Sequence, residues 1–220
     1  MKLSISNTLQ DQLPYFFISA YTFTLMQPGI EKKSDVITGL FQQLAEIYRA
    51  KYKLEDVVNI PRIKHIRDGY KRLKKDPSHT RPACEALLRR ILKYGEIYRL
   101  GDAIDIGNYI SLLLMKSVCM VDADAIQGDI FIRMGTKEDY YEGIHRGVLN
   151  VENLPLYEDE ISAFGNPTSD TLRTAITSNT KHILVMLIHF DDEIAQDEKQ
   201  MEHILNTYLN IQNLTKIETQ

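Results

Sequence analysis

Apolar residues recur every three or four positions along several stretches of the chain, the spacing of one face of an α-helix. In the first of these stretches, the apolar residues that would share a face are Ile37, Leu40, Phe41, Leu44, Ile47 and Tyr48. Pro61 and Pro82 suit the first turn of two further helices, because a proline there gives up an N–H that has no intrahelical partner. The pattern predicts helices over 35–48, 61–75, 82–94, 102–115 and 193–209.

Runs of aromatic and β-branched residues predict the strands. The two most apolar runs are 13–26, LPYFFISAYTFTLM, and 182–190. A short strand should also precede a turn near Asn7. Further short strands are expected at 117–122, 128–134, 161–164, 172–177 and 214–219. Polar segments with proline or glycine predict loops at 27–34 and 136–155.

These elements predict an α+β fold in which a mixed β-sheet is flanked by helices. A chain of 220 residues can bury a substantial core in one compact unit, so we expect a single domain over 1–220. Within it, 1–60 would form an N-terminal supporting part, 61–190 the central region, and 191–220 a C-terminal helix and tail.

The composition is that of an ordinary globular protein, with 44% hydrophobic and 25% charged residues. Cys84 and Cys119 match neither a disulfide framework nor a paired metal spacing, so a reducing, cytoplasmic setting is the default expectation. The apolar run 13–26 is too short to span a bilayer and contains serine and threonine, so we expect no membrane attachment.

Charge is distributed unevenly along the chain. The net charge is −4, which argues against non-specific nucleic-acid binding by the whole surface. Between Arg62 and Lys93, however, eleven lysines and arginines face only three acidic residues, a local charge of +8. This run indicates either an ordinary solvated face or a surface that contacts phosphate groups.

Polar residues also gather in the central stretch 81–133, where a simple core would not need them. They are Glu85, Asp102, Asp105, Asn108, Asp122, Asp124 and Arg133. The structural interpretations are that Glu85 bonds to the start of its helix and that Asp122 and Asp124 form a turn. Asp105 and Asn108 share a helix face, where they would bond to loop backbone or shape the floor of a pocket.

The sequence contains no motif of a known nucleophile, phosphate loop or zinc hydrolase. A calcium loop starting at Asp122 is excluded, because its sixth position is Gln127 and its twelfth is Arg133. The six histidines are scattered, and His182 and His189 would point to opposite faces of one strand. We therefore expect no metal site and no cofactor, and a buried, unreactive Cys119.

The central stretch resembles the tRNA-binding B3/B4 domain of the phenylalanyl-tRNA synthetase β subunit. The family pattern has a helix begun by proline with a Leu-Arg-Arg run, then acidic, asparagine, glycine and arginine positions at set spacings. The matching residues are Pro82, Leu88, Arg89, Arg90, Asp105, Asn108, Asp122, Asp124, Gly128, Ile130 and Arg133. The segment 168–174, followed by Thr180 and a hydrophobic strand, resembles the closing hairpin of the family. The resemblance covers about 60–190.

In the synthetase, this module holds a cleft that hydrolyses tyrosine wrongly attached to the phenylalanine tRNA. The resemblance implies a free-standing tRNA-binding module, and it leaves open whether the chain also clears misacylated tRNA in trans. The corresponding cleft residues would be Asn108, Cys119, Arg133, Ser169, Asp170 and Thr174. The residues expected to contact RNA phosphates are Lys64, Arg67, Lys71, Lys74, Arg89 and Arg90. The catalytic residues are unknown.

Two partners follow from this hypothesis: tRNA, and an aminoacyl or amino-acid ligand in the cleft. No DNA specificity is expected. The chain has no catalytic aminoacylation domain, so it would not charge tRNA by itself. The alternative is a non-enzymatic protein that binds an amino acid or small molecule and has lost RNA, because a fold does not determine a function. A third possibility is a structural subunit of a larger complex.

Overall fold

The computed structural model describes residues 1–27 and 34–220. It has the expected α+β class, but the strands form three sheets instead of one. The helices are α1 (Asn7–Gln12), α2 (Asp35–Lys51), α3 (Pro61–Arg72), α4 (Ala83–Tyr94), α5 (Asp102–Leu114) and α6 (Ile194–Tyr208). Short 3₁₀ turns are η1 (Asp56–Asn59), η2 (Ala123–Ala125) and η3 (Leu172–Thr174). Most of the loop predicted at 27–34 lies outside the described residues.

The first sheet has five strands and is mixed, because β1 runs parallel to β4 while the other neighbours are antiparallel. In spatial order its strands are β1 (Leu3–Ile5), β4 (Ile130–Met134), β7 (Pro155–Glu158), β8 (Ala163–Asn166) and β9 (Ser169–Asp170). The ends of the chain meet at this edge, where Leu3 N donates to the carbonyl of Glu218 at 3.0 Å.

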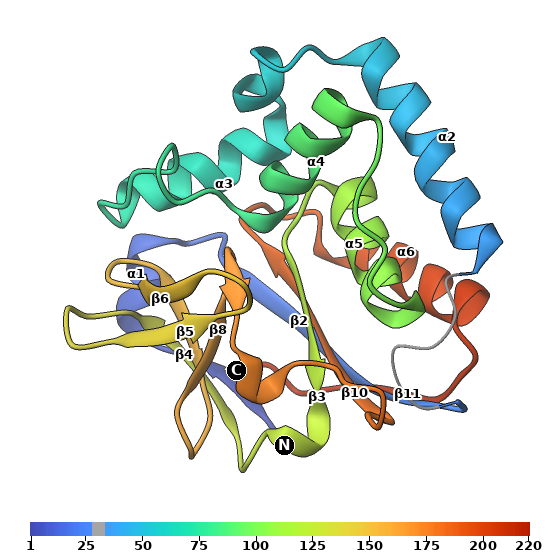
Figure 1. Ribbon diagram of the computed structural model, residues 1–220. Helices are drawn as coiled ribbons and strands as arrows, with labels where there is room; N and C mark the ends of the chain where they lie inside the picture. The colour runs from blue at the N-terminus through green and yellow to red at the C-terminus, as the bar shows by residue number, and fades with distance from the viewer. Residues whose placement is uncertain (28–33) are drawn as a thin grey trace.

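The second sheet has four antiparallel strands with the most apolar strand inside it. Its order is β11 (Ile211–Lys216), β2 (Phe17–Leu25), β10 (His182–His189) and β3 (Val118–Asp122). Every residue of β10 except His182 is buried, as expected for a strand covered on both faces. Figure 1 shows helices α2, α3 and α4 together on one side of the sheets.

The third sheet is a hairpin of β5 (Tyr140–Gly143) and β6 (Gly147–Asn150). The prediction of a loop over 136–155 was therefore wrong. This hairpin has its own small cluster of buried residues, Tyr141, Val151 and Leu156, separate from the main core. Cross-strand pairing and this packing, rather than an apolar run, create the hairpin, which is why a pattern search does not find it.

The N-terminal segment also differs from the prediction. The turn expected near Asn7 is helix α1, and Ser6 caps it by accepting a hydrogen bond from Leu9 N at 3.3 Å. The strand expected at 172–177 is replaced by β9 and η3. None of the described helices is long and apolar enough to cross a membrane.

One glycine determines how α3 meets the core. A Cβ at Gly69 would lie 2.5 Å from Cδ1 of Phe190, whose ring also packs edge-on against Phe16 at 5.2 Å. No side chain larger than a hydrogen atom fits there without displacing the ring. The absent Cβ thus allows α3 to lie directly on the residue that follows β10.

We predict that Gly69→Ala lowers the free energy of unfolding by about 1–3 kcal/mol, the usual cost of overpacking a filled core. Gly39→Ala is the matched control, because it is also a helical glycine but its added Cβ has nothing within 4 Å. That variant should be neutral or more stable, since alanine favours helix. Urea unfolding of the three proteins measures both effects, and equal stability of the two variants would contradict the close contact.

Candidate functional site

A row of cross-strand neighbours brings Asp170 to the inner face of the five-stranded sheet. Ile132 pairs with Tyr157, Tyr157 with Gly165, and Gly165 with Asp170. Directly paired residues point to the same face, and Ile132 and Tyr157 are completely buried. A Cβ on Gly165 would lie 2.7 Å from Oδ1 of Asp170, so the glycine leaves the space that the carboxyl group occupies.

Asp170 and Cys119 meet in this interior although they are 51 positions apart. Asp170 as a residue is half-buried, but its carboxyl group is enclosed and shares a hydrogen bond with the Cys119 thiol. Burial raises the pKa of Asp170 to about 7, an effect that the hydrogen bond to Cys119 partly offsets. Burial also raises the pKa of Cys119 well above its ordinary value, so the thiol stays protonated. A carboxyl group that titrates near neutrality can accept or donate a proton.

A tyrosine hydroxyl in the same interior has no hydrogen-bond partner among the described residues. Tyr157 is completely buried, and its hydroxyl makes no hydrogen bond among the described residues. Buried polar groups normally have a partner, so this hydroxyl is suited to a water molecule or a ligand. Nearby, Asn166 Nδ2 donates to the Tyr141 hydroxyl at 2.6 Å, and that hydroxyl donates to the Ser169 carbonyl at 2.5 Å. These bonds tie the β5–β6 hairpin to β8 and β9.

Arg133 lies on the opposite face of the same sheet. It neighbours Ile132, and successive strand residues point to opposite sides. Its guanidinium binds Asp139 at 2.7 Å and Glu158 at 2.7 Å. These two hydrogen-bonded carboxylates, Asp139 first, raise the pKa of Arg133 further. The structure thus gives Arg133 a bracing role and separates it from Asp170 and Cys119.

Of the remaining predicted cleft residues, Ser169 and Thr174 lie near Asp170, and Asn108 lies away from it. Ser169 and Thr174 belong to the segment that carries Asp170, and Thr174 is completely buried. Asn108 is on α5, where the preceding Gly107 lies against Met120 of β3. Because Met120 and Cys119 point to opposite faces of β3, Asn108 lies away from the Cys119 side.

A cavity of about 440 Å³ opens beside this segment. It lies between the α3–α4 loop and the β5–β6 hairpin, and Asn166 and Thr168 belong to its wall. Lys75 and Arg146 are its cationic lining residues, Asp76 is acidic, and Val148, Leu149 and Leu154 add apolar surface, so cations outnumber acids in a mixed lining. Lys75 also donates to the carbonyl of Glu152 at 2.8 Å and so holds the hairpin against the loop.

Two of the six predicted RNA-binding residues hold a buried carboxylate. Glu85 of α4 is completely buried, with Arg67 at 2.9 Å and Arg89 at 2.8 Å. A buried carboxylate requires such partners, because desolvation of an unpaired charge is costly. Glu85 therefore has a structural role, through two arginines instead of the helix-start bond that we expected.

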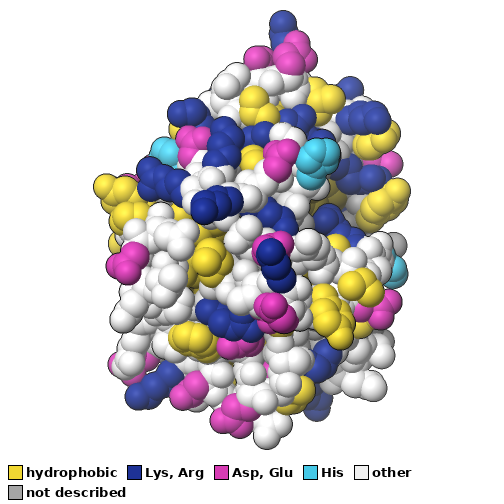
Figure 2. All heavy atoms as spheres, turned by 90° about the vertical axis from the view of Figure 1, so that its left-hand side faces the viewer, with side chains coloured by type: hydrophobic (Ala, Val, Ile, Leu, Met, Phe, Trp, Pro, Cys, Tyr) yellow, Lys and Arg dark blue, Asp and Glu magenta, His cyan; other side chains and the backbone are white. Residues whose placement is uncertain are grey.

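The other predicted RNA-binding residues remain accessible to different degrees. Lys64 and Lys71 are exposed and share Asp68, at 3.6 Å and 3.4 Å, while Lys74 is exposed at the end of α3. Arg90 is half-buried, with its guanidinium 3.6 Å from the centre of the Tyr98 ring. Figure 2 shows Lys and Arg side chains concentrated on the upper half of the face that carries the end of α3.

A second buried cluster surrounds Lys116, at the end of α5. Its ammonium group lies 2.5 Å from Asp191, 2.6 Å from Asp197 and 2.9 Å from Nδ1 of His189. Asp197 is also paired with Arg62 at 2.9 Å. His189, Asp191 and Asp197 are close enough together to ligate a metal ion, but Lys116 and Arg62 together already neutralise the two carboxylates.

The hydrogen bonds of His189 follow from its burial. Burial, together with the positive charge of Lys116, lowers the pKa of His189 to about 3, so the ring is neutral. Nδ1 accepts from Lys116, so Nε2 carries the proton and donates to Ser19 Oγ at 2.9 Å. The Ser19 hydroxyl then donates to Glu198 at 2.6 Å.

Sequence reasoning missed Tyr141, Tyr157, Asn166 and the Lys116 cluster. Tyr141 lies within the predicted loop 136–155, and no motif in the sequence marks Asn166. Lys116 had one available signal, because it directly follows the apolar helix α5 and precedes an apolar strand. A charge enclosed by apolar elements indicates a buried pair. Asp105 was interpreted correctly: it accepts from Leu100 N at 2.9 Å and Arg99 at 2.8 Å.

Comparisons with known proteins identify a family and a similar solved structure. The family model of the B3/4 domain matches residues 65–210, about two thirds of the chain. An N-terminal fragment of the phenylalanyl-tRNA synthetase β subunit from Pyrococcus horikoshii is similar in structure, with a TM-score of 0.47 and 12% identity. The match covers 94% of this chain and 48% of that one, so this chain spans about half its length. No curated protein matches the sequence.

The raised pKa of Asp170 predicts how stability depends on pH. An aspartate that keeps its proton in the folded state up to about pH 7, but loses it near 3.8 when unfolded, destabilises the fold as pH rises. Relative to Asp170→Asn, the wild type should lose up to about 1.4 kcal/mol per pH unit between pH 5 and pH 7, and little above pH 8. Urea unfolding at pH 5, 6, 7 and 8 measures the difference, and parallel curves would contradict an enclosed carboxyl group.

Proposed function

Because the chain belongs to the B3/4 domain family, a domain related to tRNA synthetases, we propose that it binds tRNA and hydrolyses amino acids wrongly attached to it. One observation carries the proposal. Asn166 and Thr168 lie in the wall of the cavity that Lys75 and Arg146 also line, and they directly precede Ser169 and Asp170 in the chain. Cationic groups attract the end of an RNA strand, and the enclosed carboxyl group supplies proton-transfer chemistry beside it.

RNA binding in this proposal uses the exposed cations of α3 and the following loop. Lys64, Lys71 and Lys74 would make positioning contacts with phosphates, since such contacts carry no sequence information. Arg67 and Arg89 would act indirectly by holding Glu85 and thereby fixing α3 against α4. Arg90, stacked on Tyr98, is the remaining member of the predicted set. Since tRNA is charged in the cytoplasm, the proposal implies that location.

Hydrolysis in this proposal uses Asp170 as a general base. The carboxylate would take a proton from water as the water oxygen attacks the ester carbonyl, and Asp170 would return that proton to the ribose oxygen as the bond between this oxygen and the carbonyl carbon breaks. Cys119, Ser169 and Thr174 would position the ester or the water by hydrogen bonds. Asn108 and Arg133, predicted for the same cleft, would support the sheet and helix around it without touching the substrate.

A second function is favoured by the pairing of the basic residues. Arg67 and Arg89 are committed to Glu85, and Lys75 bonds to carbonyls of the hairpin, which leaves fewer free cations for phosphate than the sequence indicates. This arrangement is compatible with a protein that binds an amino acid or small molecule and no RNA.

The proposed RNA binding is tested by reversing the charge of two exposed lysines. We expect Lys71→Glu with Lys74→Glu to weaken binding of uncharged tRNA by about 10-fold or more at low salt and to reduce the salt slope by about 2. Lys181→Glu with Lys199→Glu is the matched control, because both lysines are exposed and lie on other elements. Fluorescence anisotropy measures all three proteins. Equal weakening by both double variants would contradict a specific basic face.

The hydrolytic half is tested with misacylated tRNA. The wild type should release the amino acid faster than the uncatalysed reaction, with a rate that rises through about pH 7 as Asp170 ionises. Asp170→Asn should lower the rate by about 10²–10⁴-fold while leaving tRNA affinity unchanged. Release of labelled amino acid gives the rate. Tight tRNA binding without any release of the amino acid would contradict the proposed hydrolysis but not the proposed tRNA binding.

A further inference from the structure

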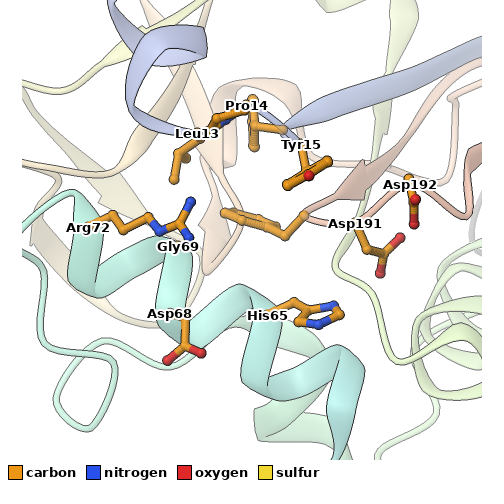
Figure 3. A pocket seen from close by; sticks show the side chains of 11 residues that line it. Leu13, Pro14, Tyr15, His65, Asp68, Gly69, Arg72, Asp191 and Asp192 are labelled. Carbon is orange, nitrogen blue, oxygen red and sulfur yellow. The ribbon is translucent and has the colours of Figure 1, made fainter.

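A second cavity, of about 340 Å³, is lined by none of the residues predicted for the cleft or for RNA phosphates. It lies between the segment 13–16, helix α3 and the residues that follow β10. Figure 3 shows Leu13, Pro14 and Tyr15 along one side, Arg72 at one end, and Asp191 and Asp192 at the other. Its volume lies within the range of small-molecule sites.

The middle of this cavity is apolar and fixed by packing. Phe190 is held against Phe16 at 5.2 Å and lies over Gly69, where only a glycine leaves room for its ring. Leu13 contributes aliphatic surface and Tyr15, 62% exposed, an open aromatic face. An apolar group of a ligand would be desolvated here without any rearrangement.

One end of the cavity favours a cation. The Asp191 side chain is only 6% exposed, and its Oδ1 already binds Lys116 and the amide of Glu193. Its Oδ2 accepts no hydrogen bond from any described residue, and the exposed Asp192 stands beside it. With His189 neutral, the local charges sum to −2; the groups are Arg62, Lys116, Asp191, Asp192, Glu193 and Asp197.

The other end favours an anion. Arg72 makes no hydrogen bond or ion pair with any described residue, and its guanidinium is directed toward the cavity in Figure 3. The nearby Asp68 is already paired with Lys64 and Lys71. His65, near the acidic end, and Arg72 are separated by seven residues of α3, which corresponds to about 10 Å along the helix axis.

We propose that this cavity binds a small zwitterion with an apolar body, of the length of a dipeptide. The ammonium group would bind Asp191 Oδ2 and Asp192, the carboxylate would bind Arg72, and an apolar side chain would lie on Phe190. A free amino acid carries both charged groups on one carbon atom, so it can reach only one end of the cavity at a time. A dipeptide extends for about 7 Å, and the side chains of Arg72, Asp191 and Asp192 reach across the remaining distance between the two ends of the cavity.

This site is separate from the tRNA hypothesis. Tyr70 stands between the two cavities: its ring lies 6.1 Å from Phe190, and its hydroxyl is 3.1 Å from Thr168 in the wall of the first cavity. A ligand at Phe190 therefore needs neither RNA nor Asp170. Binding can be measured whatever the outcome of the tRNA experiments.

The test is calorimetric titration of the full chain with leucyl-leucine, N-acetyl-leucyl-leucine, leucyl-leucine amide and leucine. Leucyl-leucine should bind saturably with a Kd below about 1 mM, a modest affinity for a ligand of this size. Each blocked peptide and leucine should bind about 10-fold more weakly or worse, because each lacks one charged contact. Arg72→Gln and Asp192→Asn should cause similar losses for leucyl-leucine.

Arg146→Gln, an exposed arginine of the other cavity, is the matched control and should leave the Kd unchanged. Both test residues are exposed, so the variants should fold normally, which thermal unfolding verifies. Absence of saturable binding, equal affinity for the blocked peptides, or unchanged binding by both variants would overturn the proposal. If leucine bound as tightly as leucyl-leucine, the ligand would not need to reach both charged ends of the cavity, and the proposed binding geometry would be wrong.

Discussion

The buried ammonium group of Lys116 is the constraint on which the central part of the molecule depends. It joins the segment after α5 to the segment after β10 through Asp191, and to α6 through Asp197. Arg62 extends the network to α3. Removal of one partner from a buried ion pair typically costs about 3–5 kcal/mol, because the other charge stays desolvated. Two cations, Lys116 and Arg62, therefore hold α3, α5, α6 and strand β10 in fixed positions relative to one another.

The same physics decides which basic residues are available for function. Glu85 is buried where α3 and α4 meet, so it must be neutralised, and it engages Arg67 and Arg89. The cations left for a ligand are those without a buried acid to neutralise, which lie on the outer side of α3 and in the following loop. Asp170, unlike Glu85, is buried without a cation beside it, and its pKa is therefore raised to about 7.

Helices and strands with a regular pattern of apolar residues were predicted well, because that pattern can be recognised without knowing which distant residues pack against it. Strand β10 and helices α2, α3, α5 and α6 are examples. The β5–β6 hairpin was missed because its stability comes from cross-strand pairs such as Tyr141 and Leu149, in a polar sequence with glycines. The resemblance grouped Asp170, Cys119 and Arg133 in one cleft, and in the structure Asp170 and Cys119 lie together while Arg133 lies on the other face of the sheet. Spacing along the chain does not specify which face of a sheet a side chain occupies.

In the proposed function, the exposed cations of α3 and the following loop meet RNA phosphates. This interaction is tested most directly by the affinity of the wild-type protein for uncharged tRNA across a series of salt concentrations. Our account predicts saturable binding whose logarithm falls linearly with the logarithm of salt, with a slope that corresponds to several phosphate contacts. Absence of binding at low salt, or an affinity that does not depend on salt, would contradict it and favour a protein that binds only small molecules.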